Sequence, residues 1–136
     1  LHGAKKSSLF EPEVNLKLGQ KYIQMLLADE AIKGDLFLMT AAWNGGPGNL
    51  NKWRRKIDDL DDSLFFIETL PSHETRGFIE HVFTNLWIYH DQLGQAAPSL
   101  DAIAAGRWPL YIAQDKESLQ VAENGEDRGR AEVPAR

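Results

Sequence analysis

An aromatic residue and an amide stand side by side where an apolar run gives way to glycines. Trp43 and Asn44 follow the apolar segment 36–41, and three glycines and a proline come directly after them. Gly45 can leave a helix in a left-handed conformation, and Pro47 cannot continue one. The ring of Trp43 suits the apolar face of a sugar, and the amide of Asn44 offers a donor and an acceptor to hydroxyl or acetamido groups. A plain helix end with a buried tryptophan is the alternative, and this motif alone leaves both open.

A second group of polar side chains follows Pro71. Glu74 and Arg76 fall in the first turn of a long predicted helix, and Phe78 comes four residues after Glu74 on the same helix face. Glu74 and Phe78 can therefore line one groove. The helix dipole by itself also favours an acid in a first turn. Arg76 is expected to be structural and to pair with a carboxylate such as that of Glu68, and Phe78 can also belong to the core.

Three motifs, in this order, resemble the catalytic domain of soluble lytic murein transglycosylases. Residues 9–19 read L-F-E-P-E-V-N-L-K-L-G, where the family has L-F-D-P-E-x-N-x-x-L-G. Residues 42–48 read A-W-N-G-G-P-G, where the family has A-Y-N-A-G-P-G. Residues 68–79 read E-T-L-P-S-H-E-T-R-G-F-I, where the family has E-x-I-P-x-x-E-T-R-x-Y-V. The similarity covers about residues 9–90, and three ordered matches are far more specific than any one of them.

The resemblance implies an all-α, lysozyme-like domain, of the goose-type lysozyme and lytic transglycosylase kind, that cleaves the MurNAc–GlcNAc β-1,4 bond of peptidoglycan. In the family, the C6 hydroxyl of muramic acid attacks C1 while one glutamate acts first as acid and then as base. The product carries a 1,6-anhydromuramoyl end, and no water is consumed.

The family's general acid is missing from the expected place. It is a glutamate followed by serine, on a helix upstream of a G-L-M-Q-L-M-P segment, and this arrangement does not occur here. Glu11 and Glu13 match the later D-P-E run instead. We therefore expect the chain to be the C-terminal part of such a domain, with no catalytic residue of its own. The general acid is expected N-terminal to Leu1, and the chain alone is expected to be inactive.

The resemblance carries substrate-binding roles onto four residues. Asn44 matches the asparagine of A-Y-N, which lies in the family's glycan groove. Glu74 matches the glutamate of E-T-R, which faces that groove and can meet substrate hydroxyls or amino groups of the stem peptide. Trp43 and Phe78 stand where the family more often has tyrosine, so both rings remain and both hydroxyls are lost. The residues expected to shape the motifs without binding substrate are Gly45, Pro47, Gly48, Glu68 and Arg76.

Composition and residue pattern argue against several kinds of binding partner. The 136 residues carry a net charge of −5, which argues against a nucleic-acid surface. No stretch approaches the twenty or so apolar residues of a membrane span. The four histidines include no H-x-x-x-H pair, so we expect no metal site and treat them as surface or groove-edge residues. No cofactor is expected. The partner that the resemblance implies is the glycan strand of peptidoglycan, in the periplasm or cell envelope.

The sequence predicts helices joined by short connections. Segments 1–8 and 114–136 are expected to be frayed and disordered, respectively. Segment 9–94 is expected to form the C-terminal part of the transglycosylase domain, and 95–113 a short helical extension. The expected helices start at Pro12, after Asp35 as N-cap, at residue 49, after Asp61 or Asp62, and after Ser72. The second of these is expected to end at Trp43, and the third at residue 56.

Two other functions stay open on the sequence. A goose-type lysozyme would hydrolyse the same bond on the same fold. A degenerate relative would bind peptidoglycan or act as an assembly module without cleaving it. Absent N-terminal helices would leave apolar surface exposed, so we also expect association with the rest of the domain or with another chain.

Overall fold

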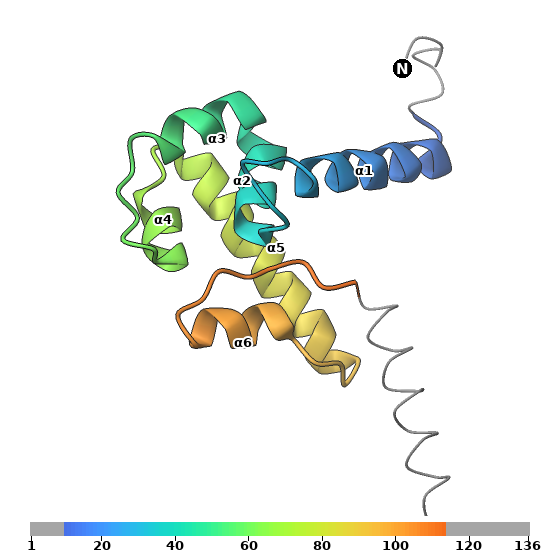
Figure 1. The fold of residues 1–136 in the computed structure, drawn as a ribbon. Helices are drawn as coiled ribbons and strands as arrows, with labels where there is room; N and C mark the ends of the chain where they lie inside the picture. The colour runs from blue at the N-terminus through green and yellow to red at the C-terminus, as the bar shows by residue number, and fades with distance from the viewer. Residues whose placement is uncertain (1–9, 114–136) are drawn as a thin grey trace, which may run out of the picture.

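Helices make up the named elements of residues 10–113, which are the residues that the computed structural model describes (Figure 1). In order they are α1 (Pro12–Leu27), α2 (Leu36–Gly45), α3 (Pro47–Arg54), α4 (Ser63–Thr69), α5 (His73–Gln92) and α6 (Pro98–Ala104). Within this range, extended backbone pairs only in an isolated bridge between Asp35 and Leu110. The predicted all-α class is confirmed. The predictions for segments 1–8 and 114–136 fall outside the described residues.

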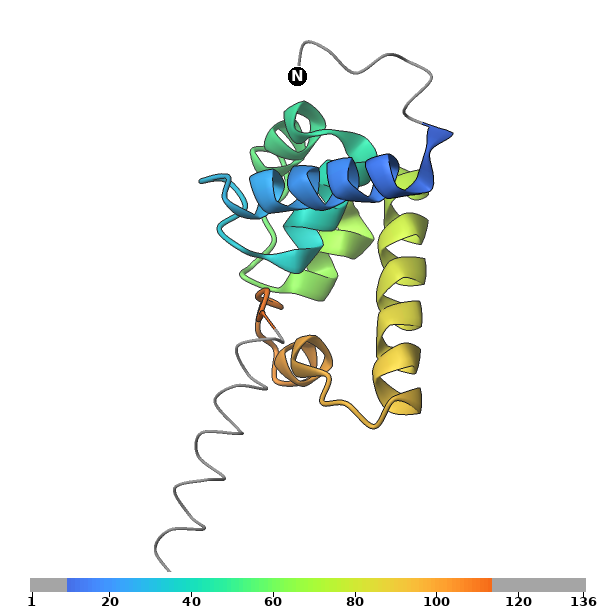
Figure 2. The same cartoon turned by 90° about the vertical axis from the view of Figure 1, so that its right-hand side faces the viewer.

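Helix α2 lies at the centre of the fold. It packs against α1, α3 and α5, and Figures 1 and 2 show it enclosed by these neighbours. Its small residues Ala41 and Ala42 are fully buried and let the neighbouring helices approach closely. Phe37, also buried, meets the ring of Phe83 on α5 edge-on, with the ring centroids 4.6 Å apart. Because α2 is held on several sides, both of its ends are fixed in place.

Three helices begin at side-chain caps that the sequence predicted. The carboxylate of Asp35 accepts a bond of 2.8 Å from the backbone N–H of Leu38 at the start of α2. Asp62, rather than Asp61, caps α4 by accepting bonds from two backbone N–H groups. Ser72 caps α5. Such bonds satisfy donors that the first turn of a helix leaves without partners.

The turn after Trp43 is tighter than the sequence suggested. Helix α2 continues through Gly45, so the prediction that it ends at Trp43 is wrong by two residues. Gly46, with φ of +85°, makes the turn, and Pro47 is the first residue of α3. Proline suits this position because its missing N–H would have no helical partner there. The predicted start at residue 49 and end at residue 56 are likewise each wrong by two residues.

The segment after α5 folds back onto α2. The indole N–H of Trp87 on α5 donates to the hydroxyl of Ser99 on α6, at 3.0 Å. Beyond α6, the backbone at Pro109 accepts a bond of 2.8 Å from Leu36, the first residue of α2. Figure 2 shows α6 almost end-on beside the lower part of α5. This return brings the chain near residue 110 against the N-terminal end of α2.

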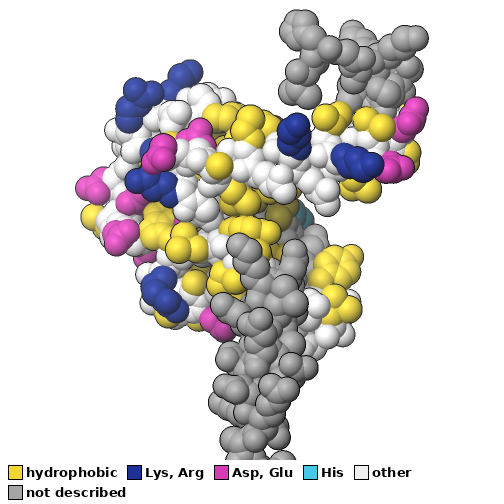
Figure 3. Space-filling model, turned by 45° about the vertical axis from the view of Figure 1, so that its right-hand side comes forward, with side chains coloured by type: hydrophobic (Ala, Val, Ile, Leu, Met, Phe, Trp, Pro, Cys, Tyr) yellow, Lys and Arg dark blue, Asp and Glu magenta, His cyan; other side chains and the backbone are white. Residues whose placement is uncertain are grey.

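An apolar groove opens between α1, α2, α5 and the returning segment. It encloses about 460 Å³. Its apolar lining residues are Ile23, Leu27, Leu36, Met39, Leu86, Tyr89, Leu93, Pro98, Leu110, Tyr111 and Ile112. Figure 3 shows hydrophobic side chains gathered on this side of the molecule. His90, expected at the surface or at a groove edge, lines this apolar groove and is only 7% exposed, so it is not a surface residue.

Candidate functional site

The C-terminal end of α2 and the N-terminal end of α5 meet at a shallow polar pocket of about 410 Å³. We call it the Asn44 pocket. Its lining residues are Asn44, Gly45, Asn49, Trp53, Pro71, Ser72, Glu74 and Thr75. Two residues predicted to bind substrate, Asn44 and Glu74, thus lie in one pocket although they come from separate motifs.

A short chain of hydrogen bonds holds the Asn44 side chain. The hydroxyl of Thr75 donates to Oδ1 of Asn44 at 2.8 Å, and the Oγ atoms of Thr75 and Ser72 are 2.9 Å apart. The backbone N–H of Thr75 donates to Oγ of Ser72 at 3.2 Å. Thr75 is 1% exposed, and Asn44 and Ser72 are partly buried. The amide of Asn44 is therefore tied to the first turn of α5 and cannot turn freely at the end of α2.

Gly45 brings the ring of Trp53 into the same pocket. A Cβ atom built on Gly45 would lie 2.5 Å from Cη2 of Trp53, closer than any real contact. Only glycine therefore lets the half-buried indole of α3 lie this near the end of α2. Trp53 was not among the residues that the sequence predicted to bind substrate, and its place at the pocket was missed. Gly45 ends α2 and Trp53 lies in α3, so the turn at Gly46 stands between them and no period along a single helix relates the two residues.

The two aromatic residues predicted to bind substrate do not line the Asn44 pocket. Trp43 is 39% exposed and packs against Tyr22 of α1, with ring centroids 5.4 Å apart. Gly19 of α1 also faces the Trp43 ring. Phe78 is partly buried, one turn further along α5 than Glu74. The pocket thus contains the amide and the acid of the prediction, and its aromatic ring is that of Trp53.

Arg76 makes a different bond from the expected ion pair. Its guanidinium donates to the backbone carbonyl of Glu68 at 2.7 Å, and the Glu68 carboxylate is not its partner. The last carbonyl groups of a helix have no helical donors, and Glu68 lies at the end of α4. Arg76 therefore joins the end of α4 to the start of α5 and holds the turn before Glu74. Glu74 itself is exposed in the first turn of α5.

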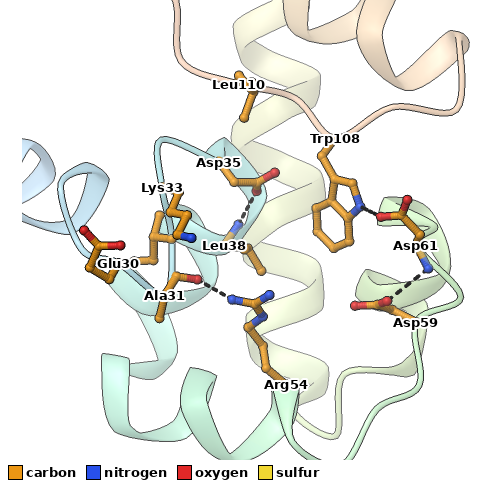
Figure 4. A pocket seen from close by; sticks show the side chains of 11 residues that line it. Glu30, Ala31, Lys33, Asp35, Leu38, Arg54, Asp59, Asp61, Trp108 and Leu110 are labelled. Atoms are coloured by element: carbon orange, nitrogen blue, oxygen red, sulfur yellow. Dashed lines mark hydrogen bonds between the residues drawn. The ribbon is translucent and has the colours of Figure 1, made fainter.

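A second pocket, of about 360 Å³, lies at the opposite end of α2 (Figure 4). Asp35, Arg54 and Trp108 are among its lining residues. The guanidinium of Arg54 donates to the carbonyl of Ala31, and the indole N–H of Trp108 donates to the Asp61 carboxylate at 3.1 Å. Asp35, Arg54 and Trp108 thus each have a hydrogen-bond partner within the protein.

Asp35 is the most strongly perturbed acid in the described part of the chain. It is 4% exposed, and this burial raises the pKa of its carboxyl to about 6 from the usual 3.8. Bonds from the backbone N–H groups of Leu38 and Phe37, and the charge of Arg54, act in the opposite direction and are weaker than burial. Nine residues of helix separate Asp35 from Asn44, which is about 14 Å along α2. The perturbed acid therefore does not face the Asn44 pocket.

The comparisons with known proteins point to lytic transglycosylases. The family model for the transglycosylase SLT domain matches residues 2–66. Over these residues the chain is similar to the transglycosylase SLT domain. The chain is 31% identical over 87 residues to a soluble lytic murein transglycosylase of Salmonella typhimurium, which is 64% of this chain and 13% of that protein. It is 28% identical over 99 residues to the one of Escherichia coli K12, which is 73% of this chain and 15% of that protein.

The SLT match covers only part of the Asn44 pocket. It includes α1, α2, α3 and the start of α4, so Asn44, Gly45 and Trp53 fall inside it and Glu74 falls outside it. The chain spans less than a sixth of the length of the curated relatives it matches. No solved structure matches it significantly.

Other kinds of site were sought in residues 10–113. These residues contain no group of three or more His, Cys, Asp or Glu side chains that could hold a metal ion. Among the same residues, no helix is long and apolar enough to cross a membrane. The Asn44 pocket is the one that contains two of the residues predicted to bind substrate, Asn44 and Glu74.

Proposed function

We propose that the segment matched by the SLT model, together with the start of α5, forms part of a peptidoglycan lytic transglycosylase. We also propose that the Asn44 pocket binds the glycan strand. One observation carries the proposal: Asn44 and Glu74, predicted as substrate-binding residues from motifs thirty residues apart, line the same pocket. Curated relatives of the segment are soluble lytic murein transglycosylases, which supports a cell-wall substrate. A peptidoglycan substrate in turn implies a location in the cell envelope.

The chemistry of the pocket fits an N-acetylated sugar. Asn44 supplies amide donors, and the exposed carboxylate of Glu74 accepts bonds from hydroxyl or amino groups. The half-buried indole of Trp53 offers an apolar surface between them. The amide donors and the carboxylate acceptor can bond to polar groups at the edge of a pyranose ring, and the indole can pack against its apolar face.

The general acid, in this proposal, comes from a glutamate N-terminal to Leu1. Donation to a glycosidic oxygen needs a protonated carboxyl in dry surroundings. Glu74 is exposed, and Asp35 lies at the far end of α2 with its carboxylate capping the helix. Neither is placed to donate a proton to a sugar in the Asn44 pocket.

The proposed reaction breaks the MurNAc–GlcNAc bond without water. The C6 hydroxyl of muramic acid attacks C1, the glutamate protonates the leaving oxygen, and the same glutamate then takes the proton of the C6 hydroxyl. The nucleophile belongs to the substrate, so proximity lowers the barrier by several kcal/mol without help from the protein. The task left to the Asn44 pocket is to hold the glycan in register.

Mass spectrometry of digested peptidoglycan tests the proposal. The complete protein that contains this chain is incubated with purified peptidoglycan, and the muropeptides are compared with those made by a hydrolytic lysozyme. Products lighter by one water would establish 1,6-anhydro ends and a transglycosylase. Reducing ends would establish a hydrolase instead. Binding to insoluble peptidoglycan without cleavage would establish a non-catalytic module, and the absence of both would contradict the proposal.

A further inference from the structure

We propose that Thr75 is a positioning residue that turns the Asn44 amide so that its N–H groups, and not its oxygen, face the glycan. This inference rests on the proposed function, because it names the sugar group that the Asn44 pocket recognises. It follows from the number of protons available in the bonds that join Asn44, Thr75 and Ser72.

The direction of these bonds is set by their acceptors. Oδ1 of Asn44 has no proton, so the bond of 2.8 Å must use the hydroxyl proton of Thr75. Thr75 has a single hydroxyl proton, so when it donates to Asn44 the contact of 2.9 Å between the two hydroxyl oxygens uses the proton of Ser72. The backbone N–H of Thr75 donates back to Oγ of Ser72. The result is a one-way chain of donation from Ser72 through Thr75 to Asn44.

Burial makes the bonds of Thr75 costly to lose. Thr75 is 1% exposed, so its hydroxyl cannot turn to bulk water if a partner is removed. An unpaired polar group in such a place costs about 1–3 kcal/mol. A Cβ atom on Gly45 would lie 3.3 Å from Oγ1 of Thr75, so the glycine also leaves room for this hydroxyl. The C-terminal end of α2 and the N-terminal end of α5 therefore pack closely on either side of the Thr75 hydroxyl.

The consequence is a defined preference for the ligand. With its oxygen bound to Thr75, Asn44 presents its amide nitrogen and two N–H donors to the pocket. The partner of an N–H donor is an acceptor, and the acetamido carbonyl oxygen of an N-acetylhexosamine is the strongest acceptor on such a sugar. The exposed Glu74 carboxylate remains an acceptor for hydroxyl groups. The pocket should therefore prefer N-acetylated sugars over the corresponding free amines.

The test separates the hydroxyl of Thr75 from its bulk. Thr75→Val removes the hydroxyl and keeps the branched shape, and Thr75→Ser keeps the hydroxyl. Thr40→Val is the matched control, because Thr40 is also buried, at 3% exposed, but its hydroxyl bonds only to the carbonyl of Leu36 in its own helix, at 2.7 Å. Two quantities are measured on the full chain: the NMR signals of the Asn44 side-chain amide without ligand, and the affinities for an oligomer of N-acetylglucosamine and for the matching oligomer of glucosamine.

We expect Thr75→Val to shift the Asn44 amide signals and to weaken binding of the N-acetylated oligomer by about 3- to 10-fold, the loss of one hydrogen bond. The preference over glucosamine should fall with it. Thr75→Ser should restore both signals and preference, and Thr40→Val should leave both unchanged. The proposal is overturned if Thr75→Val keeps the wild-type preference, or if Thr75→Ser behaves like Thr75→Val.

The two proposals can fail separately. Failure of the unsubstituted chain to bind either oligomer would count against the proposed function, and with it against glycan recognition by Asn44. The ligand-free amide signals decide on their own whether Thr75 orients Asn44. Unchanged signals in Thr75→Val would overturn that part even if the glycan binds.

Discussion

The two ends of α2 show two different uses of a polar side chain. At the N-terminal end, the carboxylate of Asp35 is buried and bonded to the backbone of its own helix. At the C-terminal end, the oxygen of Asn44 bonds to a hydroxyl of another helix, and its nitrogen stays open to the pocket. Both ends adjoin pockets of similar size, so volume does not distinguish them.

The difference lies in which groups remain for a ligand. Around Asp35 the neighbours bind each other: Arg54 to the backbone of Ala31, and Trp108 to Asp61. Around Asn44, the bond to Thr75 occupies one atom of the amide and orients the other. A perturbed acid in a pocket is often a sign of function. Here the raised pKa comes from the burial of a side chain that caps a helix, and the amide of Asn44 is the better candidate for binding.

The largest expected effect on stability concerns the cap. Asp35→Asn keeps a capping oxygen and removes the charge. Because the folded pKa of Asp35 is about 6 and its usual value is 3.8, the folded state binds the proton more tightly. Wild-type stability therefore falls relative to Asp35→Asn as pH rises from about 4 to 6, by about 3 kcal/mol in all. Below pH 4 the two proteins should be alike. Urea unfolding at pH 3.5, 5 and 7 measures this, and a difference independent of pH would contradict it.

The next effect is at the other end of α2. Gly45→Ala should destabilise the chain by about 2 kcal/mol, because the new methyl group would overlap the ring of Trp53. Glycan binding should weaken at the same time, since ring and amide both line the Asn44 pocket. Gly48→Ala is the matched control: it lies within α3 with no atom inside 4 Å of the added carbon. The control should be neutral or slightly stabilising by thermal unfolding.

A smaller effect is expected from the returning segment. Trp108→Phe removes the bond from the indole N–H to Asp61 and keeps an aromatic ring beside Phe66. The bond is exposed to solvent, so the loss in stability should be about 0.5–1 kcal/mol. Affinity for N-acetylated oligomers should not change, because Trp108 lies at the Asp35 end of α2. A loss of glycan affinity in this variant would mean that the two ends are coupled.

The smallest effect on stability is expected at Glu74. Glu74→Gln changes an exposed side chain in the first turn of α5, so stability should change by no more than about 0.5 kcal/mol. Binding of peptidoglycan should weaken, because the amide is a poorer acceptor than the carboxylate. Glu80→Gln, an exposed position on the same helix outside the pocket, is the control in a pull-down with insoluble peptidoglycan. Equal binding by both variants would remove Glu74 from the glycan site.

Local signals in the sequence predicted where helices begin better than they predicted the contacts between helices. Asp35, Asp62 and Ser72 act as caps, as expected, because a cap bonds to residues only two or three positions away. The turn at Pro47 was assigned wrongly, since a proline that stops one helix can equally start the next. His90 was expected near the surface, and its burial depends on the segments that fold around α5.

The sequence by itself determined the all-α class, the caps and the resemblance to lytic transglycosylases, because periodicity, capping and ordered motifs are local in the chain. Only the tertiary structure decided that the hydroxyl of Thr75 reaches Asn44 from thirty-one residues away and that Trp53 enters the pocket over Gly45. It also decided that the guanidinium of Arg76 bonds to a backbone carbonyl. These contacts join different helices, and their geometry depends on how closely the packed helices approach, which no spacing along one helix specifies.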